Sequence, residues 1–143
     1  MFAENKAEYN WLKFLSEKDI EFNKVVNKYG KIKNNLFIME DIKSMIFICD
    51  LITREELLEL TLISSVTETP IVIAYSDGKF DIIHNVRGNL RYTLKDSAFI
   101  CQCLHCGNWW FGEYYDSLKC KNCEEQDDDK YISNMIKGCV GVF

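Results

Sequence analysis

Apolar side chains recur at helical spacing near the start of the chain. In residues 4–15 the steps are three and four residues, which predicts a helix. The positions concerned are Ala7, Trp11, Phe14 and Leu15. Ser16 with Asp19 resembles a capping box, so the pattern predicts a second helix from there to Tyr29, with Gly30 as its stop. Its apolar stripe comprises Phe22, Val25, Val26 and Tyr29.

The pattern over residues 45–49 fits two structures. Its β-branched content predicts a buried strand, whereas Ile42, Ile46 and Cys49 match one face of a helix. The next element has a clear start, because Thr53 is a good N-cap and Glu56 its capping-box partner. We therefore expect a helix from residue 54 to about residue 64.

Strand patterns follow. Pro70 opens a predicted strand over residues 71–75, which turns at Asp77-Gly78 into residues 80–84, and Asp-Gly between apolar strands is typical of a two-residue hairpin. A further strand is expected after Gly88, through Leu90, Tyr92 and Leu94. Residues 131–136 are predicted to form a short closing helix.

Two architectures follow from the ambiguous segment. As a strand, residues 45–49 complete a strand–helix–strand unit, and the body is α+β or α/β, with N-terminal helices and a small mixed sheet. As a helix, they make the body similar to a winged helix. We favour the mixed sheet, because the helix over residues 54–64 carries three glutamates and one arginine and so suits a recognition helix badly.

Four cysteines carry the clearest chemistry. They spell C-x2-C-x13-C-x2-C and are Cys103, Cys106, Cys120 and Cys123. Two such turns offer four thiolates to one tetrahedral zinc ion, and Gly107 lets the first turn adopt a positive φ. This arrangement resembles a zinc ribbon over about residues 99–126. The resemblance implies one structural Zn²⁺, since four thiolates leave no open position for water or substrate.

The ribbon divides the chain into three predicted parts. They are a helical and mixed-sheet body over residues 1–98, the ribbon over residues 99–126, and residues 127–143, an acidic segment and short helix packing on the body. Iron, two disulfides or a redox pair are the other uses of such cysteines. Cys101 and His105 could substitute as ligands, but with four better-spaced cysteines we expect neither to bind the metal.

Charge bears on the choice of partner. The chain has 143 residues and a net charge of −5, which disfavours sequence-independent binding to nucleic acid. A lysine cluster could form a local basic binding patch, and an acidic run over residues 124–129 could mimic the charge of nucleic acid, but both are most simply solvated surface. The lysines are Lys24, Lys28, Lys31 and Lys33. Lacking an apolar leader or a membrane-length apolar run, the sequence predicts a cytoplasmic protein with no membrane contact.

Catalytic motifs are missing from the sequence. We find no phosphate-binding loop, nucleophile elbow or zinc-protease signature, and the histidines are His84 and His105. A metal-nuclease site could be assembled from Asp77, Asp81 and His84. However, Asp77 is accounted for by its place in the predicted turn, and His84 by its place at the edge of a strand. We therefore expect no catalytic residues and no enzyme.

Aromatic residues fill the loop between the two cysteine pairs. The predicted partner-binding residues are Trp109, Trp110, Phe111, Tyr114 and Tyr115. Strand alternation predicts that Trp109 and Phe111 pack inward and that Trp110 is exposed on the opposite face. Exposed aromatic rings anchor protein partners or stack on bases, and the acidic chain favours a protein.

These patterns predict a non-enzymatic zinc-ribbon regulator acting by protein–protein contact. Abundant lysine, asparagine and isoleucine indicate an AT-rich source, so we expect a viral, phage- or mobile-element-encoded inhibitor of a host complex. The alternative is a nucleic-acid-binding transcription factor that combines a winged helix with a zinc ribbon. The sequence does not predict an oligomeric state.

Overall fold

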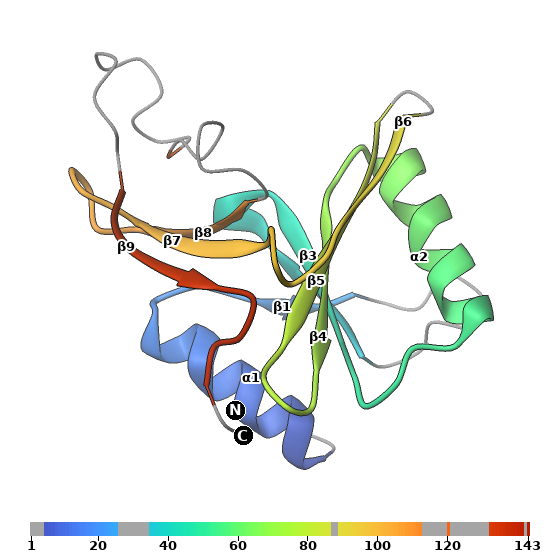
Figure 1. The fold of residues 1–143 in the computed structure, drawn as a ribbon, viewed down its shortest axis with the longest axis horizontal. Coiled ribbons are helices and arrows are strands. Elements are labelled where there is room, and N and C mark those ends of the chain that lie inside the picture. The colour runs from blue at the N-terminus through green and yellow to red at the C-terminus, as the bar shows by residue number, and fades with distance from the viewer. Residues whose placement is uncertain (1–4, 26–34, 87–88, 113–119, 121–131, 142) are drawn as a thin grey trace.

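The computed structural model describes residues 5–25, 35–86, 89–112, 120, 132–141 and 143. Within these residues the chain forms two α-helices, a six-stranded mixed sheet and a three-stranded antiparallel sheet (Figure 1). In chain order the elements are α1 (Lys6–Glu17), β1 (Asn23–Lys24), β2 (Leu36–Met39), η1 (Glu40–Ile42), β3 (Ser44–Cys49), α2 (Arg54–Thr67), β4 (Ile71–Tyr75), β5 (Phe80–Val86), β6 (Asn89–Thr93), β7 (Phe99–Cys103), β8 (Trp109–Gly112) and β9 (Ile132–Lys137).

Local hydrogen bonds fix both ends of α1. The Asn5 Oδ1 accepts a hydrogen bond from the Glu8 amide at 2.9 Å and caps the start. At the other end Asp19 takes a left-handed φ of 57°, and the Ile20 amide donates to the Leu15 carbonyl at 2.9 Å. This is a Schellman-type end, with the apolar pair Leu15 and Ile20 buried beside it.

The second helix predicted to begin at Ser16 is therefore wrong. Ser16 lies inside the last turn of α1, and Asp19 terminates that helix instead of capping a new one. Residues 23–24, inside the predicted helix, form the short strand β1. Val26, Tyr29 and Gly30 lie outside the described residues.

The ambiguous segment is a strand. β3 pairs in parallel with β4, and α2 connects the two, so the chain forms the predicted strand–helix–strand unit. The capping box at the start of α2 is present, with the Glu56 amide donating to Thr53 Oγ1 at 3.1 Å and the Thr53 amide donating to Glu56 Oε1 at 3.0 Å. α2 ends at Thr67, beyond the expected residue 64. The winged-helix alternative is wrong, because it requires a helix where β3 lies.

Both faces of the six-stranded sheet are covered. Its strand order is β1-β2-β3-β4-β5-β6, with β3 and β4 the parallel pair. α2 packs on one face, and α1 together with the three-stranded sheet lies on the other (Figure 1). Every residue of β3 is buried, which explains why its apolar run shows no alternation.

The three-stranded sheet has the order β8-β7-β9 and shares a core with the main sheet. Ile100 of β7 lies opposite Phe111 and Ile136 on its neighbouring strands, and the Phe111 ring packs edge-on against Phe80 at 5.5 Å between centroids. The closing helix predicted over residues 131–136 is wrong. Residues 132–137 form β9, because pairing with β7 satisfies their backbone groups. Tyr131 lies outside the described residues.

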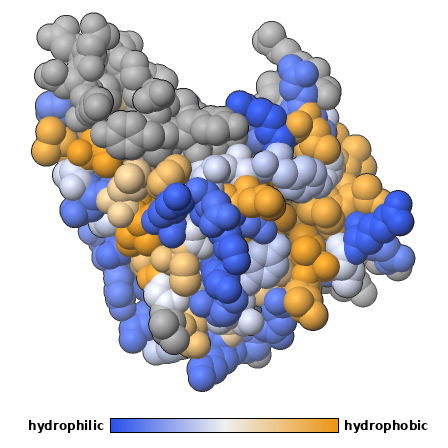
Figure 2. Space-filling view, viewed as in Figure 1, coloured by the Kyte–Doolittle hydropathy of each residue, from blue (hydrophilic) through white to orange (hydrophobic). Residues whose placement is uncertain are grey.

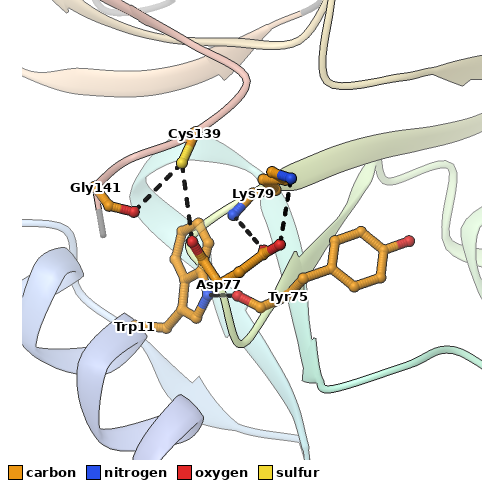
Figure 3. A network of polar contacts seen from close by, with 6 residues as sticks. All are labelled: Trp11, Tyr75, Asp77, Lys79, Cys139 and Gly141. Carbon is orange, nitrogen blue, oxygen red and sulfur yellow. Dashed lines mark hydrogen bonds and ion pairs between the residues drawn. The ribbon is translucent and has the colours of Figure 1, made fainter. Parts of the chain in front are cut away.

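The β4–β5 hairpin has a three-residue loop, one residue longer than predicted. The Tyr75 amide donates to the Lys79 carbonyl at 2.8 Å, which leaves residues 76–78 as the loop, and Gly78 has a φ of 88°. The C-terminal segment lies across this tip (Figure 3), with the Val140 amide donating to the Gly78 carbonyl at 2.9 Å. A side chain at Gly78 would overlap the Gly141 carbonyl.

Replacing Gly78 with alanine is expected to destabilise the protein by about 1–3 kcal/mol. Alanine resists the positive φ, and its methyl group would push the C-terminal segment off the hairpin. Thermal or urea unfolding measures the change, with Ser76→Ala in the same loop as the control. Equal stability of the two variants would contradict this account of the tip.

The outer face of α2 exposes apolar side chains. Leu58, Leu62 and Val66 recur at four-residue steps and are 61%, 60% and 70% exposed. Figure 2 shows apolar side chains gathered on the α2 side of this view. Such a patch is a potential contact surface and has to be controlled for in any binding experiment. No helix among the described residues is both long and apolar enough to cross a membrane.

Candidate metal centre

The first cysteine pair sits on a tight turn between β7 and β8. The Cys103 amide donates to the Asn108 carbonyl at 2.8 Å, and the Gly107 amide donates to the Cys103 carbonyl at 3.0 Å. Gly107 has the predicted positive φ, at 76°. Inside the turn the Cys106 amide donates to Cys103 Sγ at 3.4 Å, so a backbone dipole faces this sulfur. The local sequence therefore places a hydrogen-bond donor at the Cys103 sulfur.

Cys120 completes a group of three sulfurs. The Sγ atoms of Cys103, Cys106 and Cys120 all lie within 4.8 Å of one another, and those of Cys106 and Cys120 are 3.4 Å apart. A tetrahedral zinc ion with Zn–S bonds of about 2.3 Å requires sulfurs roughly 3.8 Å apart. Cys103 and Cys120 are buried and Cys106 is exposed. Three of the four predicted cysteines thus converge at a spacing at which they could hold a metal ion; Cys123 lies outside the described residues.

The remaining described cysteines stay apart from this group. Cys101 is fully buried on β7. In a regular strand Cys101 and Cys103 would point to the same side, but the pairing of β7 with β9 shifts register between Gln102 and Cys103. Burial raises the pKa of the Cys101 thiol to about 12, so it stays neutral. Cys49 lies in the core on the α2 face, and Cys139 lies on the hairpin tip with its thiol directed at the Asp77 and Gly141 carbonyls (Figure 3). His105 is exposed and does not belong to the sulfur group.

The aromatic residues of β8 divide between the two faces as predicted. Trp109 and Phe111 pack against the core shared with α1, while Trp110 packs against Cys103 and Cys120. The expected exposure of Trp110 is wrong, because this ring is half-buried over the cysteines. The indole helps to cover Cys103 and Cys120, and a drier environment strengthens the attraction of a thiolate to a cation. Tyr114 and Tyr115 lie outside the described residues.

A cleft of about 330 Å³ opens beside the cysteine group. One wall is the aromatic strand β8 with Asn108 and Cys120, and the other comes from the end of α1, from η1 and the start of β3, and from Pro70. Its lining residues are Asp19, Ile20, Asp41, Ile42, Lys43, Ser44, Pro70, Asn108, Trp109, Trp110, Phe111 and Cys120. The sequence gives no sign that the residues after α1 and in η1 line this cleft, because they lie far from the cysteines in the chain and carry no binding motif.

The alternative catalytic residues have structural roles. Asp77 Oδ1 accepts the Lys79 amide at 3.0 Å within the hairpin loop. Asp81 accepts the Tyr75 hydroxyl at 3.0 Å, and burial, followed by the charge of Asp81, raises the pKa of Tyr75 above its ordinary value. His84 Nδ1 lies 3.0 Å from Arg91 Nη2 on the neighbouring strand. Asp77, Asp81 and His84 belong to no metal-binding group among the described residues.

Comparison of this chain with family models, with curated proteins and with solved structures finds no match. Its function therefore has to be argued from its own residues.

Proposed function

We propose that this protein is a non-enzymatic regulator that binds a protein partner through the aromatic cleft beside its cysteine group. Cys103, Cys106, Cys120 and Cys123 hold one structural zinc ion, in an arrangement similar to a zinc ribbon. A site of four thiolates is closed to substrate, so the metal stabilises the contact surface and performs no chemistry. The phage or mobile-element origin that composition suggests, and inhibition of a host complex, remain predictions.

One observation carries this proposal. The rings of β8 stay partly exposed and line a cleft although two of them also contact the core, and Trp110 packs against Cys103 and Cys120 beside it. A cleft with large rings and a few polar groups is typical of a binding site, and tryptophan is prominent among the residues that dominate binding energy. A nucleic-acid partner is disfavoured by the net charge of −5 and by the carboxylates of Asp19 and Asp41 on the cleft.

Capture of the partner from the native host, followed by mass spectrometry, tests the proposal. The variants are Trp110→Ala, which removes a ring that lines the cleft, and Asn108→Arg, which fills the cleft from an exposed position and leaves every cysteine in place. Both are expected to weaken partner binding by roughly thirtyfold or more, since truncation of a dominant interface residue costs at least about 2 kcal/mol. Metal content and melting temperature must stay near wild type for Asn108→Arg.

Leu62→Glu, on the exposed face of α2, is the matched control and should leave capture intact. If Leu62→Glu abolishes capture while Asn108→Arg does not, the contact surface is α2 and the proposal is wrong. Retention on a nucleic-acid column with a steep salt dependence would favour a nucleic-acid partner instead of a protein.

A further inference from the structure

We propose that the cleft binds the side chain of an arginine or lysine presented by the partner. This inference rests on the proposed function and identifies the chemistry that the cleft recognises. The cleft volume of about 330 Å³ lies at the lower end of the roughly 300–1,000 Å³ of ligand sites, which suits one long side chain better than a helix or a whole cofactor.

The walls of the cleft suit the apolar methylene chain of an arginine or lysine side chain. Ile42 and Pro70 line the cleft together with the rings of β8, and neither Trp109 nor Phe111 is fully buried by the core. The methylene groups of lysine and arginine pack well on such surfaces while the charged end stays near water. An acidic or small polar side chain would leave these apolar walls uncovered.

The rim of the cleft suits the positively charged end of such a side chain. Asp19 and Asp41 are exposed cleft residues, and within the described part of the chain neither carboxylate makes an ion pair or a hydrogen bond. Lys43 also lines the cleft, so the charged lining residues are two carboxylates and one ammonium group. The net charge of −5 adds a longer-range attraction for a basic partner.

Lys18, which does not line the cleft, already makes a cation–π contact with a ring of β8. Lys18 places its Nζ 4.7 Å from the centre of the Trp109 ring and 5.5 Å from that of Phe14. The electron-rich face of an indole therefore already attracts a cation at the edge of this region. Arginine is expected to bind better than lysine, because its planar guanidinium stacks on rings and forms paired hydrogen bonds to carboxylates.

Short peptides test this inference without the partner. The probes are Ac-Gly-Arg-Gly-NH2, its lysine counterpart and its citrulline counterpart, which keeps the shape of arginine and removes the charge. NMR titration of the metal-loaded full-length chain follows the indole N–H signals of Trp109 and Trp110. We expect the order arginine, lysine, citrulline, with citrulline at least about tenfold weaker and with binding weakened by salt.

The double variant Asp19→Asn, Asp41→Asn should weaken the arginine peptide by roughly three- to tenfold, the range of exposed ion pairs. Asparagine tolerates the left-handed backbone at residue 19, so the fold is kept. The double variant Asp50→Asn, Asp96→Asn, at two exposed residues outside the cleft, is the control of equal charge change. Equal binding of arginine and citrulline peptides, tighter binding of adenosine monophosphate, or indifference to the double variant would overturn the inference.

Failure here is distinguishable from failure of the proposed function. If Asn108→Arg abolishes partner capture but no basic peptide binds, the cleft is a protein contact with another specificity. If the arginine peptide binds but Asn108→Arg leaves partner capture unchanged, the site exists and the proposed function is wrong.

Discussion

Replacing Cys103 with serine is expected to abolish metal retention and to unfold the three-stranded sheet. Cys103 is buried, its sulfur accepts a backbone hydrogen bond, and it lies at the end of β7, the central strand of that sheet. Metal binding in small zinc peptides contributes on the order of 10–16 kcal/mol, as much as the whole stability of a typical domain, about 5–15 kcal/mol. Since this sheet shares its core with α1, the body should lose stability as well.

Metal per chain after dialysis against a chelator measures the effect, and thermal unfolding measures its consequence. Cys123→Ser should behave as Cys103→Ser does, which tests the fourth ligand that the spacing predicts. Cys101→Ala and Cys139→Ser are the controls and should keep the metal. Loss of metal from Cys101→Ala together with its retention by Cys103→Ser would reverse the ligand assignment.

Replacing Trp11 with alanine is expected to cost about 3–5 kcal/mol of folding free energy. The Trp11 side chain is fully buried, and its ring packs edge-on against Phe14, Phe80 and Phe143 at centroid distances of 5.9, 6.2 and 5.4 Å. Its Nε1 donates to the Tyr75 carbonyl at 2.7 Å (Figure 3). Removing the ring leaves a cavity where α1, the main sheet and the C-terminal residue meet.

Trp11→Phe separates the two contributions. Phenylalanine keeps most of the ring packing and loses the hydrogen bond to Tyr75, so it should cost about 1 kcal/mol beyond the lost volume. Urea unfolding of both variants gives the comparison. A loss below about 1 kcal/mol for Trp11→Ala would mean that this cluster does not hold α1 to the sheet.

Short-range patterns predicted much of the fold correctly. Thr53 and Glu56 form their capping box, because both partners lie within one turn of helix. Gly107 adopts its positive φ because glycine has no side chain, which is a property of that one residue. Strand alternation alone placed Trp110 on the face opposite Trp109. The sulfur spacing likewise predicted that Cys103, Cys106 and Cys120 converge.

Patterns with two local solutions were decided by tertiary contacts. Ser16 and Asp19 could start a helix or end one, and burial of Ile20 beside Leu15 selected the ending. The spacing of residues 132–136 also fits a helix. These residues form a strand because their backbone groups pair with those of β7. The three-residue loop at Gly78 likewise accommodates the C-terminal segment that crosses it.

The amino-acid sequence by itself determined the geometry of the first cysteine turn, the capping box of α2 and the two faces of β8, because each depends on residues close in the chain. Only the tertiary structure decided the cleft. Asp19 follows α1, Asp41 belongs to η1 and Trp109 to β8, and these segments meet only when the second sheet packs beside α1 and η1. Trp110 was expected to be exposed and is half-buried for the same reason, since its cover is a pair of cysteines brought together by folding. Contacts between distant segments depend on packing that no local pattern encodes.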